Sequence, residues 1–193
     1  MNSSKPSPKQ HRTPAIKPSS STDSLTLDLT QPGPEHSQLM KWVGSWDVAF
    51  THSSKEGEPE KQAKGTANIT SAYNGRYIRE EYSSEFEGKQ FMGTGTTGYD
   101  RAAKQFVTTW YDNMATGISH LTGTATHEGK EITYHGTMVG PPQKSVVQLR
   151  HVVAWESDDH FSITMFHRGE GKERKVMELV YSRIASGARG VEK

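Results

Sequence analysis

Turn signals recur at short intervals along the chain after Gly44, and this spacing leaves few possible folds. The segments between the turns are roughly eight to twelve residues long and rich in Thr, Val, Tyr, Phe and Ile, which favour strands. Connections this short leave no room for a crossover helix, so successive strands are expected to pair antiparallel. The nine turns, which would delimit ten strands, lie at residues 52–59, 73–75, 87–89, 100–104, 113–117, 128–130, 140–143, 157–159 and 169–172.

A meander of ten strands has two exposed edges unless it closes on itself. Closure removes both edges and explains a sheet without long covering helices. We therefore expect an all-β fold, an antiparallel meander of about ten strands closed into a barrel. A flattened sandwich is the competing architecture. Because a barrel of about eight strands already has room for one small ligand, ten strands predict an internal cavity.

A short helix is expected before the first strand, over residues 34–43. Pro34 suits a first helical turn, Glu35 complements the N-terminal dipole, and Gly44 ends the helix. Its apolar side would plug one end of the barrel. The expected organisation is a disordered tail at 1–33 rich in Ser, Pro, Lys and Thr, the barrel at 34–185, and a flexible tail at 186–193.

The composition argues against several classes of partner and compartment. The formal net charge is +1, and the first 33 residues, with four basic and two acidic side chains, leave −1 for the remainder. This balance predicts neither nucleic acid nor a membrane surface as a partner. The chain has no cysteine, which removes disulfides, a thiol nucleophile and the commonest zinc sites. Because residues 1–30 hold no apolar signal-peptide core and no stretch approaches the roughly 20 apolar residues of a membrane helix, we expect a soluble, cytoplasmic protein.

Two local motifs stand at the beginning and at the end of the segment that is predicted to form the barrel. Gly44-Ser45-Trp46 lies at the start of the first strand, and Tyr181-Ser182-Arg183 lies in the last. The first motif resembles the Gly-x-Trp signature of lipocalins and related calycins, where the tryptophan closes the barrel floor and an arginine of the last strand stacks on it. The resemblance implies a lipocalin-like or calycin-like barrel, with Trp46 and Arg183 in the role of structural closure.

Three further stretches of the sequence, in order and with plausible spacing, match the motifs of one protein family. They are Gly98-Tyr99-Asp100, residues 104–110 with Asp112 and Gly117, and residues 171–183. Together they resemble an uncharacterised, mainly bacterial family, the domain of unknown function numbered fifteen-seventy-nine. The resemblance covers roughly residues 35–183. It implies a calycin-like barrel and no assigned activity.

Strand alternation selects the side chains that could face a cavity. Over residues 106–112 we expect the face with Phe106, Trp110 and Asp112 to point inward. Asp112 could instead cap the turn at 113–117, and the sequence leaves both roles open.

For two charged residues in the C-terminal part of the chain, Arg150 and Glu178, the question is also whether the side chain points into the barrel or into solvent. An inward Arg150 would hold a carboxylate ligand by bidentate hydrogen bonds, but the bulkier apolar face with His151 favours Arg150 in solvent. Glu178 shares its face with two valines, and a buried Glu needs a partner or its pKa rises. Candidate partners are Arg150, Arg79 and Lys175, with a structural ion pair favoured over a catalytic acid.

Five of the nine histidines lie on predicted strands. Nitrobindin-like haem proteins share the ten-stranded barrel and bind iron through one histidine, a role for which His151 and His167 are best placed here. Neither sits in a nitrobindin pattern, and no His-x-His or His-x₃-His spacing is present, so neither a metal nor a cofactor is expected. Motifs for a serine nucleophile, a phosphate loop or a dinucleotide are also lacking, so no catalytic residue is assigned.

The expected function is the binding of a small apolar or amphipathic molecule in the barrel interior. The alternatives are a barrel enzyme, an isomerase or hydrolase with Asp112 or Glu178 as general acid or base, and a haem protein. A small molecule is the expected partner, and the oligomeric state is left open, a homodimer included. The candidate ligand-binding residues are Tyr99, Trp110, Asp112, Arg150, Met165 and Glu178.

Overall fold

The computed structural model describes residues 29–53, 59–126, 129–140 and 145–185. By compactness the chain divides into two units, Met1–Thr30 and Gln31–Lys193. The first unit contributes residues 29 and 30 to the described part, and the second contains the barrel. The expected tails at 1–33 and 186–193 lie outside the described residues, except for 29–33.

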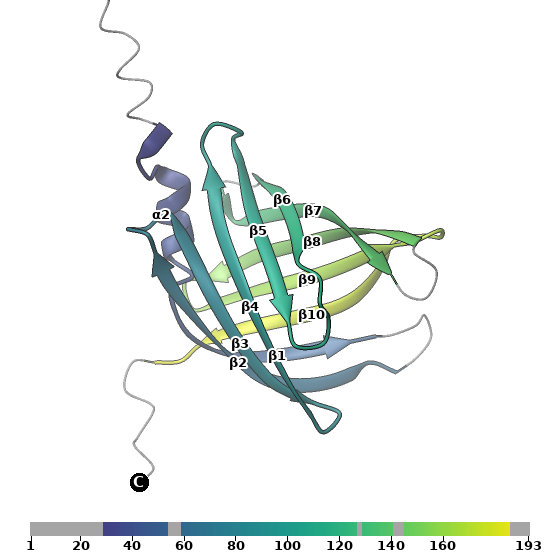
Figure 1. The fold of residues 1–193 in the computed structure, drawn as a ribbon. Coiled ribbons are helices and arrows are strands. Elements are labelled where there is room, and N and C mark those ends of the chain that lie inside the picture. The colour runs from purple at the N-terminus through teal and green to yellow at the C-terminus, as the bar shows by residue number, and fades with distance from the viewer. Residues whose placement is uncertain (1–28, 54–58, 127–128, 141–144, 186–193) are drawn as a thin grey trace, which may run out of the picture. The chain divides into compact units, whose positions relative to one another are not determined.

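In the part of the chain that belongs to the barrel, the short helix α2 (Pro34–Met40) precedes ten strands that form a closed barrel (Figure 1). Each strand pairs antiparallel with the next, and β1 pairs with β10 to close the sheet. The predicted all-β meander and its closure are therefore confirmed, and the sandwich is excluded. The elements are α2 (Pro34–Met40), β1 (Gly44–His52), β2 (Lys61–Ala72), β3 (Tyr77–Phe86), β4 (Lys89–Asp100), β5 (Gln105–Asp112), β6 (Ser119–Thr126), β7 (Glu131–Gly140), β8 (Ser145–Ser157), β9 (His160–Arg168) and β10 (Arg174–Arg183).

Local turn chemistry sets the hairpins. Between β3 and β4 the two central residues, Glu87 and Gly88, have φ of 52° and 74°. Two successive positive φ angles match the right-handed twist of the flanking strands, as a two-residue hairpin requires. The pairing of Phe86 with Lys89 on either side of the turn follows from this geometry.

The helix α2 is shorter than the predicted 34–43. It ends at Met40 because the amides of Trp42 and Val43 bond three residues back, to Leu39 and Met40, in a tightened last turn. At the other end, the backbone amide of Gly33 donates to Nδ1 of His36 at 2.9 Å. Within the described residues, no helix is long and apolar enough to cross a bilayer.

The helix covers one end of the barrel, as predicted. Leu39 is fully buried, and the side chain of Gln38 donates to the carbonyl of Gly129. Just after the helix, the ring of Trp42 packs 5.5 Å from Trp155 and 5.2 Å from Phe161. The barrel end beside α2, called the closed end below, is therefore filled with aromatic side chains.

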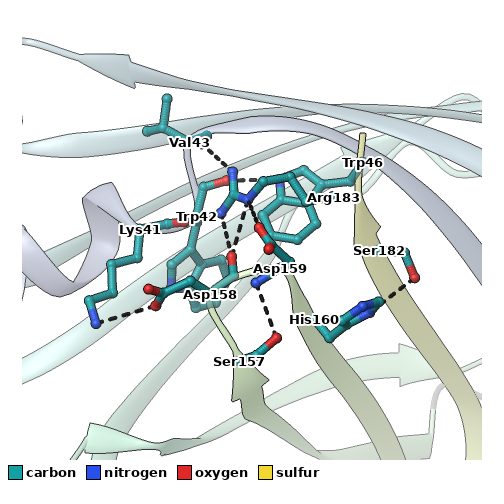
Figure 2. A network of polar contacts seen from close by, with 10 residues as sticks. All are labelled: Lys41, Trp42, Val43, Trp46, Ser157, Asp158, Asp159, His160, Ser182 and Arg183. Atoms are coloured by element: carbon teal, nitrogen blue, oxygen red, sulfur yellow. Dashed lines mark hydrogen bonds and ion pairs between the residues drawn. The ribbon is translucent and has the colours of Figure 1, made fainter. Parts of the chain in front are cut away.

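Arg183 fastens this closed end (Figure 2). Its guanidinium lies 4.1 Å from the ring centroid of Trp46, so the stacking implied by the lipocalin resemblance is present. The same group donates to the carbonyls of Lys41, Val43 and Asp158 at 2.7–3.1 Å. One side chain thus joins the end of β10 to the segment after α2 and to the turn between β8 and β9.

Candidate functional site

Strand pairing fixes which side chains point into the barrel. Residues that face each other across antiparallel strands share a face, so Val48, opposite Tyr181, and Phe50, opposite Leu179, point inward together. Because the residues of each strand alternate between the two faces, the same pairing identifies the inward-facing residues of all ten strands. Toward the closed end these side chains are aromatic and tightly packed: Phe161 stacks on Tyr181 at 4.2 Å and meets Trp46 edge-on at 4.8 Å.

The opposite end, called the open end below, is packed less tightly. Inward-facing side chains there, among them Trp110, Ile163, Met165 and Met177, are half-buried rather than buried. Side chains that point inward can be half-exposed only if solvent reaches between them. The interior is therefore accessible from the end opposite α2.

Glu80 is a carboxylate on an inward-facing position of β3. It lies between Ile78 and Tyr82 on its own face and is paired across the sheet with Ile69 and Gly95. The hydroxyl of Tyr181 donates to its Oε1 at 2.8 Å. Loss of solvation raises the pKa of Glu80 to about 7, and the hydrogen bond from Tyr181 opposes part of this rise.

Beside Glu80, three aromatic rings form a wall. Phe91 lies parallel to Trp110 at 6.5 Å, and Tyr82 meets Phe91 and Trp110 at 5.8 and 6.4 Å. Two glycines of β4 make room for the indole, since a Cβ on Gly93 would lie 2.1 Å from Cζ2 of Trp110 and one on Gly95 would lie 3.2 Å from its Cε3. The glycine-rich stretch of β4 thus lets the Trp110 ring lie flat against the sheet.

Two further polar groups lie on the inward faces of β7 and β8. Tyr134 and His151 are cross-strand partners. The phenol oxygen of Tyr134 and Nε2 of His151 are buried, and neither has a hydrogen-bond partner among the described residues. Desolvation lowers the pKa of His151 to about 4, helped by the nearby His167, and raises the pKa of Tyr134. Both groups are therefore uncharged near neutral pH.

Two more histidines face inward nearer the open end. His52 ends β1, opposite Met177, and His167 lies on β9, opposite Leu149. Desolvation is the main cause that lowers the pKa of each, and the charge of Arg174 adds to it. No three His, Cys, Asp or Glu side chains of the described part come together in a way that could hold a metal ion.

The structure brings two of the predicted ligand residues together. Nε1 of Trp110 donates to Oδ2 of Asp112 at 2.9 Å. Oδ1 of Asp112 accepts from the backbone amides of Met114 and Ala115, so the alternative role as a turn cap is also present. Trp110 and Asp112 both lie on the face of β5 that the sequence predicts to point inward.

The other predicted ligand residues are scattered. Met165 lies inside, opposite His151. Tyr99 is at the closed end, where its ring meets His36 edge-on at 6.0 Å. Tyr99 is thus separated along the barrel from Met165 and Trp110.

Arg150 and Glu178 lie on the outer surface, which removes both from the interior ligand site for which they were candidates; for Arg150 this is the solvent position that the apolar face of its strand favoured. Arg150 makes a bidentate pair with Glu173, at 3.0 and 2.6 Å, and its guanidinium lies over the ring of Phe166. Glu178 bonds Lys175 at 3.2 Å, one of its predicted partners. The bulkier apolar faces of β8 and β10 point into the barrel, so Arg150 and Glu178 on the other faces lie in solvent.

Sequence reasoning missed Glu80, Tyr181 and Tyr134 as interior polar groups. For Glu80 a signal was present, because it alternates with Ile78 and Tyr82 in a strand whose other face is charged. Read by parity, that strand already places an acid on an apolar face.

A shallow groove of about 780 Å³ lies outside the barrel, across β1 to β5. Most of its lining comes from outward-facing positions such as Thr66, Glu81 and Met92. It is open to solvent and mixed in polarity, and Tyr82 is the one buried titratable residue in its lining, whereas Glu80, Tyr134 and His151 lie away from it. We therefore take the interior as the candidate site.

Comparison with solved structures finds other barrels. The crystal structure of Rv2717c from M. tuberculosis matches with a TM-score of 0.57 and 12% identity, covering 80% of this chain and 99% of that one. The S-type phycobiliprotein lyase CPES from Guillardia theta matches with a TM-score of 0.51 and 12% identity, covering 80% of this chain and 99% of that one. At this identity the likeness is one of fold.

Comparison with curated proteins gives no match. The sequence itself matches one family over residues 31–183, which include α2 and all ten strands of the barrel. The chain therefore belongs to the family described as "Protein of unknown function (DUF1579)".

Proposed function

We propose that this protein binds a small amphipathic molecule inside its barrel, entering from the open end. The observation that carries the proposal is Glu80, a half-buried carboxylate that faces the interior and is hydrogen-bonded to Tyr181. Ligand sites in proteins are mostly apolar with a few placed polar groups. Aromatic and aliphatic side chains surround Glu80, which matches that pattern.

The wall formed by β7 and β8 supports the same proposal. Buried polar atoms are almost always hydrogen-bonded, because an unpaired one costs about 1–3 kcal/mol. The buried oxygen of Tyr134 and Nε2 of His151 have no such partner in the described part of the chain. A ligand with polar atoms would satisfy them, whereas a purely apolar one would not.

A fluorescent probe tests the proposal. Nile red, which is uncharged and brightens in apolar surroundings, should bind the full chain. Ile163→Trp adds bulk to an inward-facing, half-buried position and should weaken binding by about tenfold or more. Thr164→Trp, the neighbouring position on the outer face of β9, is the matched control and should leave binding unchanged. Equal binding by both variants would place the probe outside the barrel and overturn the proposal.

A second candidate function is a barrel isomerase or hydrolase in which Glu80 moves a proton. The favouring observation is its pKa of about 7, near the value that suits a general acid or base at neutral pH. A ligand retained through purification can be identified by comparing native with denaturing mass spectra. Conversion of that ligand by the wild type and not by Glu80→Gln would support catalysis, and recovery of the unchanged ligand from both would contradict it.

A further inference from the structure

Glu80 has one hydrogen-bond donor and no cationic partner among the described residues. Its cross-strand neighbours, Ile69 and Gly95, carry no charge, and the donor is the hydroxyl of Tyr181. A carboxylate removed from water is costly unless a positive charge or several donors compensate it. The interior thus holds an acid whose natural complement, a cation, is not supplied by the neighbouring side chains.

The surrounding groups do not reverse this charge. His151 on the facing wall stays neutral because burial lowers its pKa to about 4, and Tyr134 keeps its proton. Arg183 lies at the closed end, where it is engaged with Trp46 and several carbonyls. The middle of the barrel therefore carries either no charge or the single negative charge of Glu80. The other inward-facing acid near Trp110 is Asp112, which lies at the end of β5 and accepts from Nε1 of Trp110 and from the amides of Met114 and Ala115.

The aromatic wall beside Glu80 suits the same kind of ligand group. Tyr82 is two residues along β3 on the inward face, and Trp110 lies across Gly95 on β5. Aromatic faces attract cations, with tryptophan the strongest of them. Glu80 and Trp110 thus lie on the two sides of Gly95, and the edge of the indole ring extends over that glycine.

From this arrangement we propose that the polar group of the bound molecule is an organic ammonium, held by Glu80 and the faces of Tyr82 and Trp110. The proposal rests on the proposed function, because it specifies the class of molecule that the interior accepts. The apolar part of the ligand would then lie among Ile163, Met165 and Met177 toward the open end.

Three probes with the same chain and different head groups test this proposal: decylammonium, decanol and decanoate, each used to displace Nile red from the full chain. At about pH 8, above the pKa of Glu80, the carboxylate is charged and we expect decylammonium to bind at least about tenfold more tightly than the other two. Glu80→Gln should remove that preference while leaving decanol binding unchanged.

Two further variants make the result specific. Glu81→Gln removes a carboxylate from the outer face of the same strand, where it pairs with Arg79, and should keep the preference. Tyr181→Phe removes the donor that opposes the rise in the pKa of Glu80, so the preference for decylammonium should appear at a higher pH than in the wild type. Where Glu80→Gln does not fold, a preference in Tyr181→Phe with the same pH dependence as in the wild type would contradict the role of Glu80. Equal displacement by all three probes, or a preference for decanoate, would overturn the proposal and leave interior binding standing. Failure of Nile red to bind the wild type would instead overturn the proposed function.

Discussion

The hydroxyl of Tyr181 donates a 2.8 Å hydrogen bond to Oε1 of Glu80, joining β10 to β3 across the barrel interior. The two residues are 101 positions apart in the sequence, so no local pattern pairs them. The pair sets an acid in an apolar interior, and desolvation acts on both members by raising the pKa of each. The charge state of Glu80 should therefore be visible in the stability of the whole fold.

Glu80 predicts a pH dependence of stability. Its pKa rises from 4.5 to about 7 on folding, so between these values the folded state keeps a proton that the unfolded state has lost. The free energy of unfolding should accordingly fall as pH rises through this interval and then level off. Glu80→Gln lacks this loss, so its stability relative to wild type should rise by roughly 2 kcal/mol across the interval, allowing for solvent at the half-buried side chain. Urea denaturation at several pH values measures it, and parallel curves for the two proteins would contradict it.

His151 predicts a pH dependence of the free energy of unfolding with the opposite sign. Its pKa falls from 6.5 to about 4 on folding, so between these values the unfolded state binds a proton that the folded state does not. Stability should therefore decrease as pH falls through this interval. Relative to wild type, His151→Phe should therefore gain stability as pH falls through this interval, whereas His160→Phe, at an exposed position at the start of β9, should show no such gain. A wild-type slope preserved in His151→Phe would show that the histidine is not desolvated.

Arg183 should contribute more to the free energy of unfolding than a surface arginine does. It stacks on Trp46, donates to three backbone carbonyls and pairs with Asp159 at 3.0 Å. Arg183→Lys keeps the charge but loses the planar, multidentate geometry, and we expect it to cost about 2–4 kcal/mol in the free energy of unfolding. Lys41→Ala, at an exposed ion pair with Asp158, should cost less than about 1 kcal/mol. Equal costs in urea titrations would mean that Arg183 does not fasten the closed end.

The space above Gly93 is occupied by Trp110, so a methyl group there must displace the indole. Gly93→Ala should destabilise the protein by about 1–3 kcal/mol and shift the tryptophan fluorescence. Gly117→Ala adds the same group where nothing lies within 4 Å, and its stability should stay within about 0.5 kcal/mol of wild type. Unchanged stability and fluorescence in Gly93→Ala would contradict the packing described for β4 and β5.

Much of the fold could be predicted because it depends on local signals. Hairpin turns need residues that tolerate positive φ, and Gly88 supplies one between two strand-like segments, although Glu87, at φ of 52°, is not a typical residue for its position. Barrel closure followed from the number of strands and the exposed edges they would otherwise leave. The helix end was misplaced by three residues because the last turn tightened, which depends on hydrogen-bond geometry rather than composition.

The site was harder to predict because inward and outward faces were chosen by contacts between distant strands. In β10 both faces carry apolar side chains, and Met177, Leu179 and Tyr181 point inward because they meet β1 and β9. That choice sends Glu178 outward, where a valine neighbour, Val180, is itself 40% exposed. For Glu80 the inward face could be read from the alternation of its strand, but its hydrogen bond to Tyr181 could not, because the two residues lie 101 positions apart.

Methionine methyl groups allow the most direct test of interior binding. Met165 and Met177 face the interior, whereas Met92 and Met114 are exposed on the outside. In a protein labelled with ¹³C at its methionine methyls, titration with Nile red should shift the signals of Met165 and Met177 and leave those of Met92 and Met114 in place. Shifts at Met92 and Met114 with Met165 and Met177 unchanged would show that the molecule binds outside, and would contradict the account.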